Sequence, residues 1–581
     1  MDKRELANKI LALEGLSNDE KSALLGLLHE QKKYGLVWED KPEDVELQMA
    51  RELPVLTEVK ERAIISEAPE APNHILIEGD NLHALTALTY THAGKIDVIY
   101  IDPPYNTGNK DFVYNDRYVD KEDSYRHSKW LSFMSKRLQI AKGLLTEDGV
   151  MFISIDDHEQ SNLKMLCDEV FGEDYIEQYI WCLQDSTEGS FVKTPGLTVR
   201  KEHEYLIACF KNKGTRFKKY KGVADFKEGA FCNPDNDSRG PWFSGNISRN
   251  GIKSTTGSKY YTITNPAGIS FTRNWTLSKE EYETAFADNR IFFAKGGQGV
   301  PRLKIFQNAD KFLVQSSLFT DVHTSITGKN ELKEIFGTPP LDFPKPTTLI
   351  LRLIEIAMAK KNGLILDFFA GSGTTLHATM KLNADDGGHR QCILVTNNEN
   401  NICEEVTYVR NRRVIQGYTT PKGEKIEGLH SNTLRYYRTD FVPRVQTIAN
   451  MRALTNAATD LLCIKNNVYQ EVGAFGGRKI PAKIARYFDD GKTKMLVIYA
   501  EVYVPNFVEM LRNMAVDGKI LVYVFSNSNY AYDDDFEEVL DKVELCALPD
   551  AIYKAYKKVL RPVKAVQGTD EAADVGEEDA Q

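Results

Sequence analysis

The chain lacks the features that would place it among metal-binding, disulfide-bonded or membrane proteins. Its eight cysteines are scattered and form no CxxC pair, so neither a zinc site nor a disulfide framework is predicted. Apolar runs stay well short of the roughly 18 residues that cross a membrane. The charged start, Met1–Glu5, is not followed by an apolar segment of the kind that forms a secretory signal. We therefore expect a cytoplasmic protein with reduced thiols, no metal and no membrane partner.

A Walker loop, a DEAD-box-like helicase signature and internal repeats are also absent from the sequence. No ATP-driven or nuclease engine is therefore predicted in this chain. The net charge of −10 and the pI near 5.7 do not indicate nucleic-acid binding, although locally clustered basic residues can escape such a total. The 581 residues, 42% of them hydrophobic, are enough for roughly three to four globular domains.

The most distinctive stretch is Asp102-Pro103-Pro104-Tyr105, which directly follows a predicted buried strand over 95–101. Prolines lack N–H donors and have a fixed φ, so they end a central strand, and the residue before a proline is held extended. We therefore expect Asp102 to be held rigidly where the strand stops, at the edge where open α/β sheets bind ligands. Taken alone, the stretch also fits an ordinary strand-ending turn with a solvated aspartate.

Residues 73–157 and 347–400 each alternate strand-like and helix-like segments. Such alternation implies parallel pairing, so the predicted fold is α/β, with a doubly wound, mostly parallel Rossmann-like sheet. In the second region, a strand over 363–369 runs into the glycine-rich turn Ala370–Thr375, whose backbone can approach a ligand closely. Leu376 stands where a dinucleotide motif has its third glycine, which disfavours a dinucleotide cofactor. A turn that only packs a helix is the alternative interpretation.

Together, the DPPY stretch and the FAGSG turn at 369–373 resemble the motifs of the amino-methylating DNA methyltransferases. That family pairs a (D/N/S)PP(Y/F/W) catalytic motif with an FxGxG loop for S-adenosyl-L-methionine. Here the catalytic motif comes first and a large insert separates the two, an order that resembles the β class. Three further segments extend the resemblance: Trp130–Met134, His203–Tyr205 and Phe343–Pro346. The segment Lys33–Pro42 resembles the modification (Mod) subunit of type III restriction-modification systems. In all, the resemblance covers roughly residues 30 to 440.

The resemblance implies an enzyme that transfers a methyl group from S-adenosyl-L-methionine to the exocyclic N6 amine of an adenine flipped out of double-stranded DNA. An acceptor pair formed by the Asp102 carboxylate and the Pro103 carbonyl would free the lone pair of this poorly nucleophilic amine. Tyr105 would stack on the flipped base, and Pro104 completes the catalytic motif. In the family, aspartate at the first position goes mostly with adenine. Methylation at cytosine C5 needs a cysteine nucleophile, and the sequence has no Pro-Cys pair.

The resemblance also assigns a cofactor site. Glu399 would bind the ribose hydroxyls, Asp367 would lie near the amino group, and Lys345 belongs to the segment that closes over the methionine end. Asp80 would lie by the cofactor's adenine, although it equally fits an N-cap of the helix that follows. The complete predicted set is Asp80, Lys345, Asp367, Phe369, Gly371, Ser372, Gly373, Thr374 and Glu399.

The insert over 186–340 corresponds in the family to the target-recognition domain. Within it, Lys193–Lys221 contains nine Lys/Arg residues and two acids, a local basic patch suited to phosphate contacts, or else a solvated charged face. Arg, Asn and Gln side chains on the later loops are suited to base edges. The predicted DNA contacts are Lys193, Arg200, Lys201, Arg216, Lys218, Lys219, Arg249, Arg273 and Arg302.

The predicted domain organisation places helical additions at both ends of the methyltransferase core. Its segments are a helical arm (1–70), the catalytic half (71–185), the recognition domain (186–340), the cofactor half (341–420), a C-terminal α/β domain with a βαβ unit (421–565) and an acidic disordered tail (566–581). Implied partners are DNA, a second copy of the chain and a type III restriction subunit. A stand-alone β-class enzyme, an RNA or protein-amide methyltransferase and a catalytically dead DNA-binding module remain as alternatives.

Overall fold

The computed structural model describes residues 36–109, 111–115, 117–183, 201–221, 231–249, 257–306, 312–358, 360–528 and 530–560. The chain divides into two compact units. The insert unit comprises residues 219–315, and the main unit comprises everything before and after it. In the described part of the chain, no helix is long and apolar enough to span a membrane.

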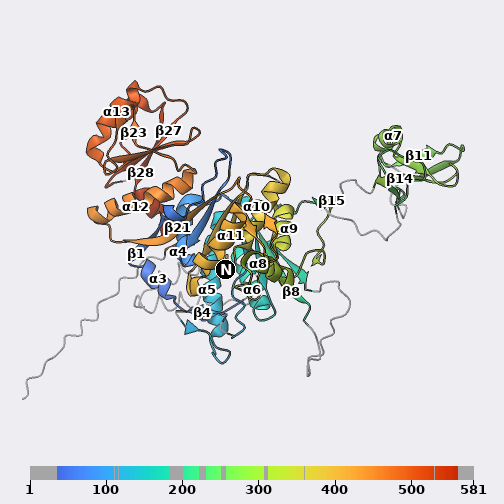
Figure 1. Ribbon diagram of the computed structural model, residues 1–581, viewed down its shortest axis with the longest axis horizontal. Coiled ribbons are helices and arrows are strands. Elements are labelled where there is room, and N and C mark those ends of the chain that lie inside the picture. The colour runs from blue at the N-terminus through green and yellow to red at the C-terminus, as the bar shows by residue number, and fades with distance from the viewer. Residues whose placement is uncertain are drawn as a thin grey trace, which may run out of the picture. The chain divides into compact units, whose positions relative to one another are not determined.

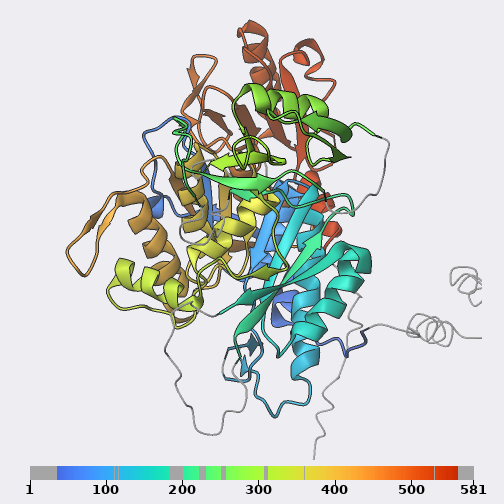
Figure 2. The ribbon, with the colours of Figure 1, turned by 90° about the vertical axis from the view of Figure 1, so that its right-hand side faces the viewer.

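A ten-stranded sheet forms the centre of the main unit (Figures 1 and 2). In spatial order its strands are β1 (Glu52–Glu58), β21 (Thr433–Pro443), β2 (Asn73–Glu78), β18 (Gln391–Thr396), β17 (Leu364–Asp367), β3 (Ile96–Ile101), β6 (Leu145–Ile155), β8 (His203–Phe210), β7 (Ile176–Cys182) and β16 (Leu318–Phe319). All pairs from β21 to β6 are parallel. The predicted α/β fold with a mostly parallel, doubly wound sheet is therefore confirmed.

Helices cover both faces of this sheet, and its central strands are therefore buried on both sides. Successive strand residues point to opposite faces, so Ile99 and Ile101 of β3 join the core cluster under the first group of helices, whereas Val98 and Tyr100, equally buried, point the other way. The first group is α4 (Asn81–His92), α5 (Arg126–Leu144) and α6 (Gln160–Phe171), and α9 (Thr347–Ala357) and α10 (Thr374–Asp386) pack together on the second face.

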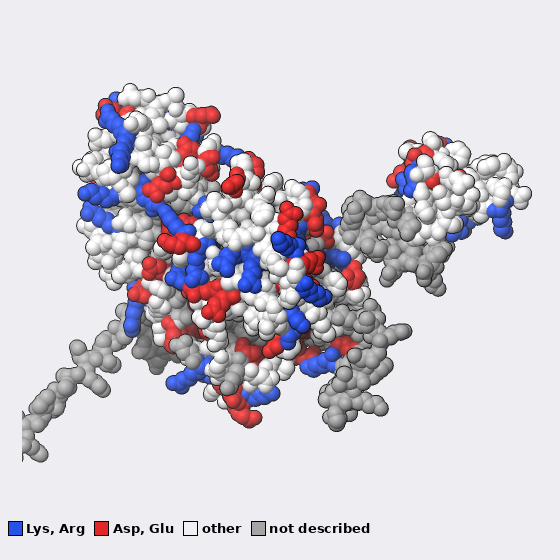
Figure 3. Space-filling view, viewed as in Figure 1, with Lys and Arg blue, Asp and Glu red and all other residues white. Residues whose placement is uncertain are grey.

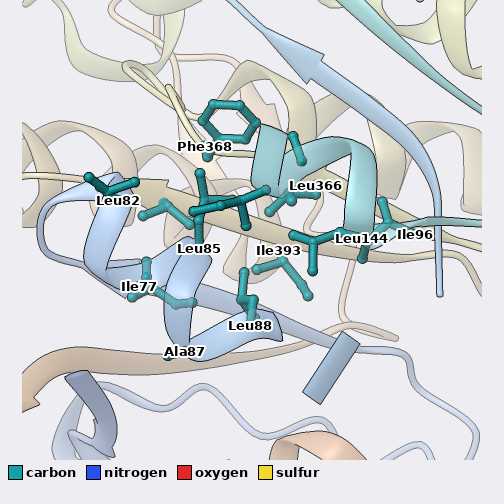
Figure 4. Packing of buried hydrophobic residues seen from close by; sticks show 14 of the residues in the cluster. Ile77, Leu82, Leu85, Ala87, Leu88, Ile96, Leu144, Leu366, Phe368 and Ile393 are labelled. Carbon is teal, nitrogen blue, oxygen red and sulfur yellow. The ribbon is translucent and has the colours of Figure 1, made fainter. Parts of the chain in front are cut away.

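Helix α4 shows how the core is built. Leu82, Leu85 and Leu88 recur every three residues along the helix and lie within 2% of complete burial. In Figure 4 they lie beside Ile77 of β2 and Ile393 of β18, side chains from segments more than 300 residues apart in sequence. Burying each of these leucine side chains contributes about 2 kcal/mol. This packing holds the two halves of the core in one sheet.

The structure describes only the second half of the predicted helical arm (1–70), and the helices predicted before residue 36 lie outside the described residues. In its described part the only α-helix is the short α3 (Asp44–Met49), whereas β1 is a strand paired antiparallel with β21. Strand β21 in turn lies within the predicted C-terminal domain, yet it belongs to the central sheet. Both strands pair with partners distant in sequence, so no local pattern marked them as part of the core.

The C-terminal region carries a second sheet of five strands in the order β22 (Glu471–Val472), β25 (Ala485–Asp489), β26 (Lys494–Ile498), β27 (Ile520–Phe525) and β28 (Val543–Leu548). Parallel β26 and β27 flank α13 (Val504–Asn513), which confirms the predicted βαβ unit. Helices α12 (Ile448–Asn466) and α14 (Asp550–Lys557) pack on α4. The buried Tyr556 hydroxyl donates to the Pro54 carbonyl at 2.6 Å. The acidic tail lies outside the described residues.

The insert unit is built mainly from antiparallel strands. A three-stranded sheet of β10 (Trp242–Asn246), β14 (Pro301–Phe306) and β13 (Ile291–Phe293) accompanies the ribbon of β11 (Tyr260–Thr264) and β12 (Ser270–Asn274), the pair β9 (Tyr220–Lys221) and β15 (Phe312–Leu313), and helix α7 (Lys279–Ala287). The unit is narrower than the predicted recognition domain of 186–340. Strands β8 and β16 and helix α8 (Ser325–Phe336) fall inside that range but belong to the main unit.

Candidate active site at the carboxyl edge of the sheet

Four predicted acidic site residues follow four neighbouring parallel strands. Asp80 follows β2, Glu399 follows β18, Asp367 is the last residue of β17, and Asp102 follows β3. These strands are adjacent in the order β2-β18-β17-β3, so their carboxyl ends meet at one edge of the sheet. The fold therefore brings together residues that are up to 319 positions apart, at the edge where α/β proteins bind ligands.

Asp102 lies at the centre of a compact polar cluster. The ammonium of Lys345, a side chain only 6% exposed, donates to both Asp102 carboxylate oxygens at 2.8 Å and to the Tyr105 hydroxyl at 2.9 Å. The Tyr105 hydroxyl lies 2.9 Å from Asp102 Oδ1 and 3.0 Å from Glu204 Oε2, so its proton is shared between two carboxylates. An ammonium has three protons, and all three are used here. The four side chains form one unit, defined below as the Asp102 cluster.

The charge states in the Asp102 cluster follow from its geometry. Burial opposes the charge on Lys345, but the charges of Asp102 and Glu204 outweigh it and raise the pKa of Lys345 above its ordinary value. Burial, reinforced by the same two carboxylates, raises the pKa of Tyr105 well above its ordinary value. At neutral pH the cluster therefore contains a cationic lysine and a neutral tyrosine.

The backbone of the DPPY stretch is fixed by α5. Trp130, fully buried on that helix, donates its indole N–H to the Pro104 carbonyl at 2.7 Å. Asn106 follows with a φ of +58° and donates its amide to the buried Glu159 carboxylate at 2.5 Å. Pro103 itself is buried. These contacts give the stretch the rigidity that its two prolines predicted.

The FAGSG turn joins β17 to α10, and its two glycines are in different surroundings. Gly371 (φ +50°) and Gly373 (φ +74°) both adopt the left-handed conformation that favours glycine. A Cβ at Gly373 would overlap the Asn411 side-chain amide, so this glycine permits close packing. A Cβ at Gly371 would have only one atom within 4 Å, the Phe369 carbonyl oxygen at 3.8 Å. The turn therefore presents an open backbone face at Gly371, as a ligand-binding loop requires.

Arg410 of α11 (Tyr408–Gln416) supports this turn by hydrogen bonds to its side chains, and the sequence did not predict this role. Its guanidinium is fully buried and donates to Ser372 Oγ at 3.0 Å and Thr374 Oγ1 at 2.7 Å. Glu331 of α8 neutralises it at 3.3 Å and also accepts from Thr347 Oγ1 at the start of α9. The hydroxyls of Ser372 and Thr374 thus face this support. Nothing in the run Arg410–Arg413 distinguishes the buried arginine from its neighbours.

The remaining predicted cofactor residues differ in environment. Burial raises the pKa of Asp367 to about 7, although its carboxylate accepts hydrogen bonds from Thr375 Oγ1 at 2.6 Å and the Phe369 amide at 3.0 Å. Asp80 accepts from the Leu82 amide at 2.7 Å, which makes it the N-cap of α4, as its alternative interpretation predicted. Glu399 is exposed at the edge, and the half-buried Phe369 packs 5.8 Å from the Phe133 ring.

The predicted DNA-contacting residues are dispersed. Lys193 and Arg200 lie outside the described residues. In the main unit, Lys201 pairs with Asp157 at 2.7 Å and Arg216 donates to nearby carbonyls. Five further positions complete the set: Lys218 and Lys219 are exposed where the two units join in sequence, Arg249 and Arg273 are exposed in the insert unit, and Arg302 is half-buried there. On the face in Figure 3, acidic and basic side chains are interspersed over the main unit, so no broad basic field appears there.

Comparison with known proteins agrees with this geometry. A family model described as DNA methylase matches residues 96–407, a range that runs from β3 through the FAGSG turn to the helix before α11 (Tyr408–Gln416). The chain belongs to the DNA methylase family. S-Adenosyl-L-methionine is accordingly its cofactor. The open face at Gly371 and the row of carboxylates along the edge fit a ligand with a cationic amino group and a ribose diol.

Three relatives show which members of the family the chain resembles. It is 34% identical over 348 residues to the type III StyLTI Mod subunit of Salmonella typhimurium, 56% of this chain and 52% of that protein. It is 33% identical over 365 residues to the type II methyltransferase M.KpnI of Klebsiella pneumoniae (59% and 84%) and 30% identical over 409 residues to the EcoP15I Mod subunit of Escherichia coli (60% and 61%). The resemblance to Mod subunits is confirmed, and the chain spans about half the length of the first of them.

Among solved structures, the chain is similar to the PvuII cytosine-N4-specific DNA methyltransferase, with 12% identity and a TM-score of 0.30 over 59% of this chain and 94% of that one. A DNA modification methylase of Thermus thermophilus, complexed with S-adenosyl-L-methionine, gives 14% identity and a TM-score of 0.27 over 58% and 94%.

Proposed function

We propose that this protein transfers a methyl group from S-adenosyl-L-methionine to the N6 amine of an adenine flipped out of double-stranded DNA. The observation that carries the proposal is the Asp102 cluster. Three acceptor atoms converge on a single nitrogen, Lys345 Nζ, at 2.8 to 2.9 Å. A site built this way at the edge of the sheet holds a nitrogen that carries several N–H bonds, which is the chemical description of the target amine.

The reaction follows from the chemistry of that amine. Its lone pair is delocalised into the purine ring, so acceptors aimed at its N–H groups favour the pyramidal, nucleophilic form. Asp102 and the Pro103 carbonyl supply these acceptors, and Tyr105 presents its ring to the base. Positioning and electrostatics would carry the methyl transfer, and the methylated amine, now acidic, would lose its proton to the Asp102 carboxylate that accepts from its N–H. An incoming amine meets the Lys345 ammonium on the same oxygens, so Lys345 shifts aside as the base enters.

Residues of the FAGSG turn and the neighbouring carboxylates would hold the cofactor. The cofactor supplies an electrophilic methyl group when bound. Gly371 offers it an open backbone face, Asp367 a buried carboxylate, and Glu399 an exposed carboxylate at the end of β18. Ser372 and Thr374 act from behind the turn, through Arg410, and Asp80 caps α4 at the far side of the same edge.

The biological setting that we propose is a bacterial-type restriction-modification system in the cytoplasm, with the chain as a type III modification subunit. Mod subunits at 30 to 34% identity support this. A restriction subunit and a second copy of the chain are the partners that this role implies. A second candidate is a stand-alone methyltransferase, favoured by the match to M.KpnI, of which 84% is covered.

Long-read sequencing of DNA from a methylation-free host, with and without this gene, tests the proposal. We expect N6-methyladenine at one defined sequence, and Asp102→Ala should abolish it while the cofactor still binds. Asp174→Ala, which removes an exposed carboxylate that pairs with exposed Lys213 at 2.5 Å, serves as the matched control and should leave methylation unchanged. N4-methylcytosine in place of N6-methyladenine would refute the adenine assignment, and retained activity of Asp102→Ala would refute the site.

A further inference from the structure

The β11–β12 ribbon of the insert unit has two unlike faces. Its strands pair antiparallel, with Thr262 opposite Thr272 and Thr264 opposite Ser270. Tyr261, Ile263 and Phe271 point into the insert-unit core beside the fully buried Trp275. The alternate residues Thr262, Thr264, Ser270 and Thr272 are all exposed and define what we call the hydroxyl face. Tyr261, Phe271 and Trp275 are therefore core, and short hydroxyl side chains form the other face, with the half-buried Tyr260 at its end.

Hydrogen bonds across the ribbon order this hydroxyl face. Thr262 Oγ1 lies 2.7 Å from Thr272 Oγ1, and Thr264 Oγ1 lies 2.9 Å from Ser270 Oγ. Each pair has two protons and uses one internally, so each keeps one donor and several acceptor sites directed outward. The connecting turn is also braced, because the Asn265 side chain accepts from the amides of Ala267 and Ile269 at 3.1 and 2.8 Å. The face is a preorganised row of donors and acceptors.

The sequence that contains the ribbon is basic. Between Asp237 and Glu280 the sequence has six Lys/Arg residues and no acid. Of these, Arg239, Arg249, Arg273 and Lys279 are exposed in the described insert unit, and Arg239 pairs with Asp237 and Asp288. The next element, α7, is acidic at its start, with Glu280 and Glu281 in its first turn. A polyanion would therefore be attracted to the ribbon and repelled by α7.

We propose that the β11–β12 ribbon enters the major groove of duplex DNA and that its hydroxyl face reads base edges. This inference rests on the proposed function. Paired strands lie about 4.8 Å apart, so a two-stranded ribbon with short side chains fits a groove about 12 Å wide. Ser and Thr hydroxyls donate to or accept from any base edge, and the threonine methyl groups can contact thymine. Arg249, whose amide donates to the Asn274 carbonyl at the end of the ribbon, flanks the hydroxyl face and would contact a phosphate, whereas Arg273 is opposite Tyr261 and lies on the other face.

The test compares the double variant Thr262→Val/Thr272→Val with Thr284→Val on α7. Valine keeps the shape and strand preference of threonine and removes both hydroxyls. The control removes an exposed hydroxyl that donates to the Glu280 carbonyl of its own helix at 2.9 Å. Ser270→Ala is a milder second variant, and thermal unfolding checks that each variant folds. Two quantities are measured. The first is kcat/KM on unmethylated duplexes that carry the recognition sequence or single-base changes in it, and the second is the affinity for unrelated duplex DNA.

We expect the ribbon variants to lose discrimination on the order of 10-fold at one or two base positions, with unrelated-duplex affinity and cofactor affinity unchanged. The Thr284→Val control should behave as the wild type. Unchanged discrimination in both ribbon variants, or an equal loss in the control, would overturn the ribbon assignment and leave the methyltransferase proposal standing. A wild-type protein that methylates no DNA would instead overturn the proposed function, and the ribbon assignment with it.

Discussion

Replacing Lys345 with methionine is the perturbation that tests the Asp102 cluster most directly. The substitution keeps the length and packing of the side chain but removes the cation between Asp102 and Glu204. Leaving one partner of a buried ion pair alone costs about 3 to 5 kcal/mol. The Asp102 and Glu204 side chains retain 29% and 17% exposure, so solvent screens part of that cost. We expect the free energy of unfolding to fall by about 2 to 3 kcal/mol.

The pH dependence of this loss gives a second, independent measurement. The pKa of Lys345 is raised in the folded protein, so the ammonium stabilises the fold fully below its unfolded pKa of about 10.4. That contribution declines only as the pH rises through the higher folded pKa. The difference between wild type and Lys345→Met should therefore be constant from about pH 6 to pH 9. It should shrink above about pH 10.4.

Chemical denaturation across this pH range, together with single-turnover methylation, forms the assay. Lys213→Met removes an exposed ion pair with Asp174 as the matched control, and should leave the free energy of unfolding nearly unchanged. Because Lys345 holds the oxygens that receive the target amine, we expect its loss to change kcat much more than the affinity for unrelated DNA. An unfolding free energy equal to that of the control, or a wild-type rate of methylation, would refute the reasoning about the cluster.

Three further substitutions test the cofactor edge. Gly373→Ala should destabilise the fold by about 1 to 2 kcal/mol, because its φ is +74° and a Cβ would overlap Asn411, and calorimetry would detect this. Because the pKa of Asp367 is raised to about 7, the wild type should lose stability as the pH rises from about 4 to 7. Asp367→Asn should remove this loss, and its persistence in urea titrations of the variant would contradict the assignment. Arg410→Met should weaken S-adenosyl-L-methionine binding more than 10-fold with little change in DNA affinity, since it releases Ser372 and Thr374 and leaves the half-buried Glu331 without this cation; equal cofactor affinity by calorimetric titration would exclude the supporting role.

The two motifs could be predicted because their signals are local. Two prolines after a buried strand, and glycines between a strand and a helix, restrict the backbone by sterics alone. The structure confirms both as strand ends. The strands β1 and β21 could not be predicted as part of the same sheet, because their pairing depends on partners hundreds of residues away. Arg410 was equally invisible, since burial of an arginine is decided by the surface that packs over it.

The sequence by itself determined the kind of chemistry. An acid before two prolines, a glycine turn after a second strand, and the order of the two motifs carry the resemblance to the DNA methyltransferases, because each is a property of a few consecutive residues. Only the tertiary structure decided which groups meet. Parallel pairing brings the carboxyl ends of β2, β18, β17 and β3 to one edge. The packing of the segment before α9 against that edge brings Lys345 to Asp102, 243 residues away. Contact between such distant residues depends on how the helices and strands pack, and that is a property of the whole fold.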